Sequence, residues 1–128
     1  MDAKKLALLC RELADNKKAE NIEVIEVKKV SSICDYFVVA TGTSEPHLRA
    51  IAGEITDRLA TDYELKPNAI DGTAQTSWVV LDFFDVIVHL MRPEVREKYS
   101  LETLWGEVPR IKPRRASAKT PSRSAAAG

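Results

Sequence analysis

The chain lacks the features by which several protein classes are recognised. None of its apolar runs approaches the 18 or more residues of a membrane-spanning helix. The first five residues lead into an amphipathic pattern rather than the apolar core of a signal peptide. The acid at position 2 also argues against an organelle transit peptide. We therefore expect no membrane contact and a cytoplasmic location.

Only two cysteines occur, Cys10 and Cys34, and they form no CxxC motif. Both lie within apolar segments, which is typical of reduced, buried thiols. A disulfide between them is the alternative, and a reducing compartment disfavours it. With His47 and His89 they make four potential zinc ligands, but no two share the spacing of a zinc motif. Nothing near Cys34 would lower its pKa and make it a nucleophile.

The charges cancel over the whole chain but are unevenly distributed. The 128 residues carry 19 Lys and Arg and 19 Asp and Glu. Residues 1–109 hold 13 basic and all 19 acidic side chains, a net charge of −6, whereas residues 110–128 hold six basic side chains and no acid. Binding to nucleic acid by broad phosphate neutralisation needs clustered Lys and Arg. The acidic part of the chain is therefore not expected to bind nucleic acid in that way.

Hydrophobic periodicity predicts an order of helices and strands. Apolar residues at helical spacing begin at Leu6, and a second helical stripe follows Ser44, a predicted N-cap. The continuous apolar run 36–40 is typical of a strand covered on both faces. The predicted elements are a helix ending near residue 16, strands at 22–27 and 36–41, a helix from 45 to about 59, a strand near 68–70 closed by Asp71-Gly72, strands at 77–82 and 85–91, a helical turn at 93–99, and a last turn at 101–105 capped by Ser100.

The two strands at 77–82 and 85–91 are predicted to form an antiparallel hairpin. If Phe83-Phe84 is the two-residue loop, Asp82 faces Asp85, Val80 faces Ile87 and Trp78 faces His89. A two-residue loop usually contains Gly or Asn, so a longer loop is the alternative.

These elements predict a mixed five-stranded sheet flanked by helices, an α/β fold bordering on α+β. One domain is expected over residues 1–108. Residues 109–128 are nearly all Pro, Arg, Lys, Ser, Thr and Ala, which bury too little apolar surface to become ordered. We expect a disordered basic tail, which is either simply solvated or in weak contact with rRNA phosphates.

Two segments resemble parts of catalytic sites. The turn at 41–44 joins a buried strand to a helix, a place where phosphate binds in many α/β folds, but it lacks the Lys and further glycines of a P-loop. A tight turn with an N-cap is the simpler interpretation. Asp82 and Asp85 resemble the paired acids that hold a divalent cation in nucleotidyl transferases, although such sites usually have a third carboxylate. Solvated hairpin acids are the simpler interpretation.

Trp78 is a candidate for binding a partner. Trp78, Val80 and Asp82 share one face of their strand, and Val79 and Leu81 share the other. If Val79 and Leu81 face the core, the tryptophan stands on the opposite face as part of a binding patch. Periodicity alone leaves a core tryptophan equally open.

Two blocks of residues stand out by their order and spacing. The first reads SSICDYFVVATGTS over residues 31–44 and is followed by His47. The second reads WVVLD over 78–82 and DVIVH over 85–89, followed by Arg96, Tyr99, Leu101, Glu102, Leu104 and Trp105. From about residue 4 to residue 107 the pattern resembles the Iojap-related ribosomal silencing factors, the RsfS family.

This resemblance implies a regulator rather than an enzyme, with no cofactor. Family members bind the large ribosomal subunit through ribosomal protein L-fourteen, keep the small subunit from joining, and lower translation when nutrients are limited. Their fold is similar to that of nucleotidyl transferases without the active site, and they can form homodimers. Carried over by position, the partner-binding residues are Trp78, Val80, Asp82, His89, Tyr99, Leu101 and Trp105, with Asp35 and His47 as further candidates.

The sequence departs from the family pattern at three places. The family commonly has Gly in the hairpin turn where this chain has Phe84, which puts the local turn geometry in doubt. It often has Glu-Gly where this chain has Asp71-Gly72. The basic tail lies beyond the pattern, so its role is open. The alternative functions are a nucleotidyltransferase-type enzyme and a general RNA-binding module.

Overall fold

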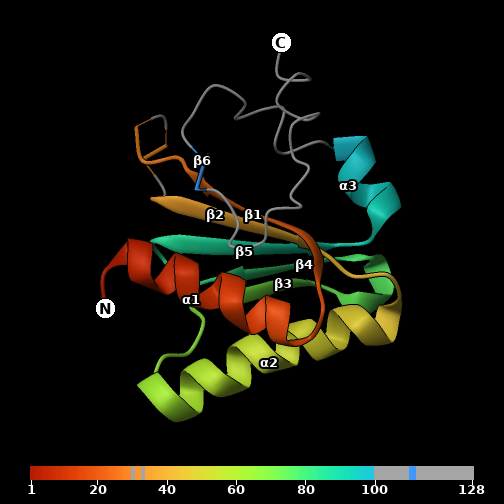
Figure 1. Cartoon of the computed structure of the whole chain (residues 1–128), viewed down its shortest axis with the longest axis horizontal. Helices are drawn as coiled ribbons and strands as arrows, with labels where there is room; N and C mark the ends of the chain where they lie inside the picture. Colours follow the sequence, from red (N-terminus) through yellow and green to blue (C-terminus); the bar gives the residue numbers. More distant parts are fainter. Residues whose placement is uncertain (30, 33, 100–109, 112–128) are drawn as a thin grey trace.

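The computed structural model describes residues 1–29, 31–32, 34–99 and 110–111. Figure 1 shows a sheet with two long helices on one face and a short third helix on the other. The helices are α1 (Ala3–Asn16), α2 (Glu45–Tyr63) and α3 (Pro93–Tyr99), with a short 3-10 helix η1 (Ala74–Thr76). The strands are β1 (Glu20–Glu26), β2 (Tyr36–Thr41), β3 (Ala69–Thr73), β4 (Trp78–Asp82), β5 (Val86–Met91) and β6 (Arg110–Ile111).

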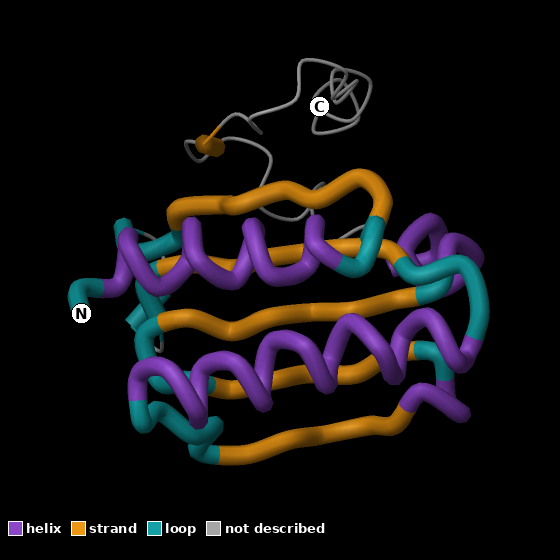
Figure 2. The backbone as a smooth tube through the Cα atoms, turned by 60° about the horizontal axis from the view of Figure 1, so that its bottom comes forward, coloured by secondary structure: helices purple, strands orange, loops and turns teal. Residues whose placement is uncertain are grey.

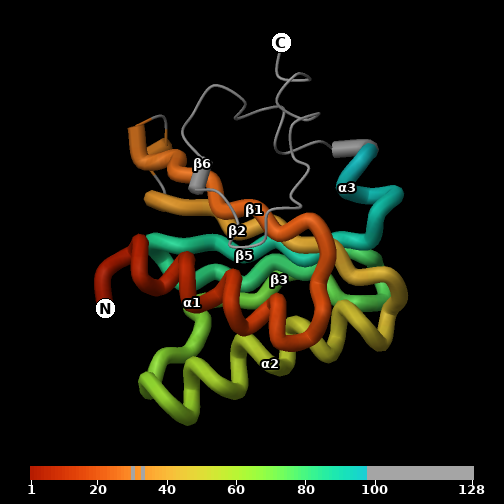
Figure 3. Tube along the Cα trace, viewed as in Figure 1, coloured from red at the N-terminus to blue at the C-terminus, as the bar shows by residue number. Residues whose placement is uncertain are grey.

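The sheet is mixed, with the strand order β3-β4-β5-β2-β1-β6. Only the central pair β5 and β2 is parallel; every other neighbouring pair runs antiparallel. Figure 3 follows the chain from β2 through α2, β3 and β4 before it returns as β5 beside β2. The predicted mixed five-stranded sheet is thereby confirmed, with a two-residue sixth strand added at one edge. None of the helices in the described part of the chain is long and apolar enough to cross a membrane.

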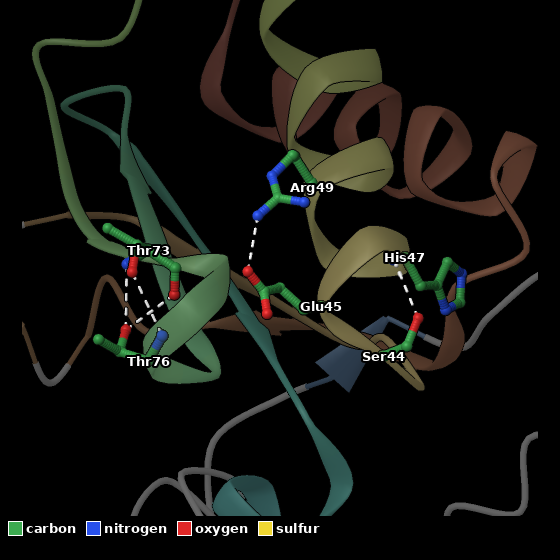
Figure 4. Close-up of polar contacts among 6 residues, drawn as sticks. All are labelled: Ser44, Glu45, His47, Arg49, Thr73 and Thr76. Carbon is green, nitrogen blue, oxygen red and sulfur yellow. Dashed lines mark hydrogen bonds and ion pairs between the residues drawn. The ribbon is translucent and has the colours of Figure 1, made fainter.

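Both long helices begin at side chains that cap their first turn. The Asp2 carboxylate accepts a hydrogen bond from the Lys5 backbone N–H at 2.8 Å. Ser44 Oγ accepts one from the His47 backbone N–H at 3.2 Å, as Figure 4 shows. Each cap satisfies a helix N–H that has no partner within the helix. The predicted N-cap at Ser44 is therefore confirmed.

The main core lies between the two long helices and the sheet, the face seen in Figure 2. Val79 and Leu81 of β4 point into it and are almost fully buried. Alternation along a strand then turns Trp78, Val80 and Asp82 to the opposite face. The other buried residues of this core include Leu6, Cys10, Leu13, Val24, Val38, Leu48, Ile51, Ile55, Leu59, Val88 and Leu90.

The hairpin register differs from the predicted one by two residues. Trp78 lies opposite Met91, Val80 opposite His89 and Asp82 opposite Ile87. The Phe83 N–H donates to the Val86 carbonyl at 2.9 Å, so the turn residues are Phe84 and Asp85 rather than Phe83 and Phe84. Phe83 is buried in the main core, which draws it out of the turn. Because side chains alternate with a period of two, this shift leaves the same residues on each face.

The position of this turn explains why the family commonly has Gly where this chain has Phe84. Phe84 has a φ of 71°, in the left-handed region that glycine adopts most easily, and it is 63% exposed. Phe84→Gly is expected to raise the free energy of unfolding by about 0.5–1 kcal/mol, because relief of backbone strain exceeds the added entropy of the unfolded chain. Urea unfolding measures the change. Phe84→Ala, which keeps the Cβ, serves as the control, and an equal gain there would contradict this explanation.

Strand β3 also runs further than expected. Asp71-Gly72 does not close it; both residues pair with β4, opposite Val80 and Val79. Gly72 has a φ of 75°, and a Cβ at this position would collide with the Trp78 carbonyl oxygen. The strand continues to Thr73 because glycine allows this conformation and this close approach.

The start of the predicted tail takes part in the sheet. Arg110 and Ile111 pair antiparallel with Ile25 and Val24 of β1. These two residues lie beyond the domain boundary that we predicted at residue 108. Residues 112–128 lie outside the described part of the chain, so their disorder stays a prediction, as does the boundary.

Candidate protein-interaction face

The face of the sheet opposite α1 and α2 carries four of the predicted partner-binding residues, and we call it the Trp78 face. Its apolar side chains form a second cluster. At its centre Ile25, Val39 and Met91 are fully buried. Around them lie the partly buried side chains Phe37, Trp78, Ile87 and Val95. The accessible part of the face is therefore a rim of half-buried aromatic and aliphatic groups.

Strand pairing brings four of the predicted residues together. Trp78, Val80 and Asp82 follow one another on this side of β4, and His89 of β5 lies directly opposite Val80. All but His89 are half-buried. Tyr99 is the last residue of α3, whereas its side chain and the predicted residues Leu101 and Trp105 lie outside what the structure describes. Their part in the interface stays a prediction.

The indole of Trp78 is tied to His89. Its Nε1–H donates to His89 Nδ1 at 3.2 Å. On the other side of the imidazole, Phe37 of β2 makes an edge contact with ring centroids 4.9 Å apart. The sequence indicated each residue separately, but not this contact, because it depends on the register of three strands.

His47 does not belong to the Trp78 face. It lies on α2, on the opposite side of the sheet (Figure 1). Its Nδ1 accepts from the Thr43 backbone N–H at 2.9 Å, and its Nε2 lies 2.8 Å from the Lys17 carbonyl oxygen. His47 thus joins the end of α1 to the turn before α2, which is a structural role.

The turn at 41–44 uses its backbone donors within the chain. The Gly42 N–H donates to the Met91 carbonyl at 3.0 Å, the Thr43 N–H to His47, and the His47 N–H to Ser44. These contacts favour a tight turn with an N-cap over a phosphate site. Figure 4 shows this helix start with the Glu45–Arg49 ion pair of its first turns. It also shows the cap of η1, in which the hydroxyls of Thr73 and Thr76 each accept from the backbone N–H of the other residue.

Three carboxylates approach Cys34 at one end of the sheet. Asp35, Asp82 and Asp85 each raise the pKa of this thiol, after burial, which is the larger cause. Asp82 Oδ1 also accepts from the Phe84 backbone N–H at 2.8 Å, so it stabilises the hairpin turn. Among the described residues no group of three or more His, Cys, Asp or Glu side chains is arranged to hold a metal ion. The geometry there gives no support to the cation or zinc sites weighed above.

Both thiols are expected to react slowly. Burial raises the pKa of Cys10 to about 12, and burial with the neighbouring acids raises that of Cys34 to about 11, from an ordinary 9.0. At a given pH the thiolate population of Cys34 is then about 100-fold lower than in an exposed cysteine, so alkylation by iodoacetamide should be at least about 100-fold slower in the folded chain than in urea.

The same shift gives a pH dependence of stability. Above about pH 9 the thiols ionise in the unfolded chain while they stay protonated in the folded one. The contribution of the buried, protonated thiols to the free energy of unfolding is therefore fully present below about pH 9 and is lost as the pH rises toward 11–12. Rapid alkylation of either thiol in the native chain at pH 8 would contradict the buried placement. Both thiols are free, so the alternative of a Cys10–Cys34 disulfide is wrong.

A buried charged cluster anchors α3 beside the Trp78 face. Arg96 Nη1 donates to Thr41 Oγ1 at 2.8 Å, and its Nη2 lies 3.8 Å from Glu23 Oε2. All three residues are buried. The sequence signals were weak: one of the acids along a β-branched strand, and a basic residue in a short helix. Only the fold brings them together.

Comparisons with known proteins agree on one family. Residues 1–128 match the family described as "Ribosomal silencing factor during starvation", RsfS. The chain is 34% identical over 111 residues to the "Ribosomal silencing factor RsfS" of Halalkalibacterium halodurans, covering 87% of this chain and 94% of that one. It is 36% identical over 98 residues to the mouse protein "Mitochondrial assembly of ribosomal large subunit protein 1", covering 73% of this chain and 42% of the mouse protein.

A solved structure shows the same fold. The crystal structure of a protein from Chromobacterium violaceum superimposes with a TM-score of 0.78 at 30% sequence identity, covering 95% of this chain and 99% of that one. This chain belongs to the RsfS family of ribosomal silencing factors, and its role lies in regulating translation at the ribosome.

Proposed function

We propose that this chain binds the large ribosomal subunit through ribosomal protein L-fourteen, blocks joining of the small subunit and represses translation when nutrients are limited. Membership of the RsfS family supports a ribosomal partner. The name of the mouse relative, which refers to the ribosomal large subunit, supports the choice of that subunit. We place this action in the cytoplasm, and we propose that it is regulatory rather than enzymatic.

The observation that carries the proposal is the position of Trp78. It is half-buried on the face of the sheet opposite the two long helices, among the apolar side chains of Phe37 and Ile87. Aromatic side chains with this combination of contact area and partial access are typical anchors of protein interfaces. A ligand of the Trp78 face would cover the rim of the second apolar cluster.

The charge of residues 1–109 fits a basic partner. Residues 1–109 carry a net charge of −6, and Asp82 lies at the edge of the apolar rim. Ribosomal proteins tend to be basic, and complementary charges speed encounter more than they deepen affinity. The mechanism needs no chemistry, because a bound domain of this size at the joining surface acts as a steric block.

Co-sedimentation with purified large subunits, with and without competing small subunits, tests this function. The chain is expected to sediment with large subunits and to reduce the yield of joined ribosomes. A nucleotidyltransferase-type enzyme would instead show magnesium-dependent nucleotide transfer that Asp82→Ala abolishes, and that result would overturn the proposal. A homodimer of the free chain stays a prediction, which analytical ultracentrifugation measures.

The tail is expected to add little specificity. Its six dispersed basic side chains provide salt-sensitive, sequence-blind attraction to rRNA. Truncation after Gly106 should leave large-subunit binding mostly intact at moderate salt and reduce its salt dependence. Truncation after Ile111, which keeps β6, is the matched control for the loss of the edge strand. If both truncations abolish binding at every salt concentration, the tail belongs to the specific site.

A further inference from the structure

The contact between Trp78 and His89 constrains the protonation state of the imidazole. The strand register places Trp78 opposite Met91 and His89 opposite Val80, so the two rings meet diagonally across neighbouring strands. The indole nitrogen can only donate, so His89 Nδ1 must accept and carries no proton. A protonated imidazole has donors at both nitrogens and cannot accept this hydrogen bond.

His89 is more deeply buried than the indole that it contacts. The imidazole is 9% exposed, with Phe37 packed at its edge and Val39 beside it on β2. Trp78 is half-buried, with ring centroids 6.1 Å from His89 at a tilt of 51°. The buried imidazole of His89 can therefore orient the more accessible indole of Trp78.

We propose that His89 is a positioning residue, whose neutral imidazole holds the Trp78 indole in the orientation used for docking. The docking part of this inference rests on the proposed function, whereas the coupling of the two rings is a property of the free chain. Protonation of His89 removes the acceptor and releases the indole, so acidification that protonates this imidazole changes the orientation of the Trp78 indole.

Charged groups from the surrounding strands and from α3 share this face with His89. The row of paired residues through His89 contains Glu23 on β1, Val39 on β2, Val80 on β4 and Asp71 on β3. Asp82 follows Val80 on the same side of β4. From α3, Arg96 lies against Glu23, and Arg92, just before α3, pairs with Glu94. Whatever the balance of these charges, a protonated imidazole has no acceptor left for the indole N–H, so protonation ends the contact with Trp78.

A titration of the free chain tests the coupling without a ribosome. The chain has two tryptophans and therefore two indole ¹⁵N–¹H peaks. The peak that is lost in Trp78→Phe is the peak of Trp78. In the native chain the Trp78 peak is expected to move on acidification with the same inflection as the His89 ring. In His89→Asn the amide oxygen replaces Nδ1 as a non-titrating acceptor, so the inflection should disappear. His47→Asn, at the other histidine, should leave it unchanged.

Co-sedimentation tests the positioning role. His89→Phe keeps a ring against Phe37 but removes the acceptor, so large-subunit binding at pH 7.5 is expected to weaken by about 2- to 12-fold, the value of one net hydrogen bond. His89→Asn should stay within about twofold of the native chain. Equal weakening in both variants would show direct contact by His89 and overturn the positioning role.

The two proposals fail in different ways. An inflection that persists in His89→Asn, or a Trp78 peak that does not move, overturns this inference alone. If Trp78→Ala leaves large-subunit binding unchanged while the free-chain titration behaves as expected, the docking role of the face fails and the coupling of the rings stands.

Discussion

Replacing Trp78 by alanine is expected to weaken binding to the large ribosomal subunit by about 30- to 1,000-fold and to restore subunit joining. A standard-size protein interface buries about 1,200–2,000 Å², and a central aromatic anchor can contribute about 2–4 kcal/mol of the binding free energy. At about 1.4 kcal/mol per tenfold change in affinity, this corresponds to the stated range. Co-sedimentation over a series of chain concentrations measures the effect.

Two controls separate an interface role from a structural one. Tyr63→Ala removes an aromatic side chain that is 50% exposed at the end of α2, away from the Trp78 face, and should not change binding. Thermal unfolding of Trp78→Ala reports on the fold. A large fall in Tm with unchanged affinity of the folded molecules would show that Trp78 serves the second apolar cluster only, and the Trp78 face would be withdrawn as the docking surface.

Replacing Arg96 by methionine is expected to lower the free energy of unfolding by about 3 kcal/mol. The Glu23 carboxylate would lose the guanidinium 3.8 Å away while remaining buried, and Thr41 would lose a 2.8 Å hydrogen bond. Removing one partner of a buried ion pair typically costs about 3–5 kcal/mol, and the long Arg96–Glu23 distance favours the lower end. Urea unfolding at constant m-value measures the loss.

The double variant Glu23→Leu with Arg96→Met provides the matched test. Replacing both members of a buried pair by apolar groups of similar volume is often close to neutral, so the double variant should regain stability to within about 1 kcal/mol of the native chain. If Arg96→Met is itself within 1 kcal/mol of the native chain, the pair does not anchor α3.

Local sequence signals predicted most of the elements. The apolar stripe that begins at Leu6, the helix cap at Ser44 and the apolar run 36–40 are signals within a few residues of the chain, and the structure has an element at each. The predictions of where β3 ends and which residues form the hairpin turn were wrong for a common reason. Gly72 and Phe84 both have positive φ values, and the pairing of the neighbouring strands, rather than local turn preference, determined where each one lies.

The sequence by itself determined the family, the order of the elements, and the division of β4 into Trp78, Val80 and Asp82 against Val79 and Leu81, because side-chain alternation is a local property of a strand. Only the tertiary structure decided which of the two sets packs under α1 and α2, since that depends on where distant helices cross the sheet. The same holds for the Trp78–His89 hydrogen bond and the Arg96–Glu23 pair. Both join residues from different elements, and their geometry follows from strand register and helix placement rather than from any short stretch of sequence.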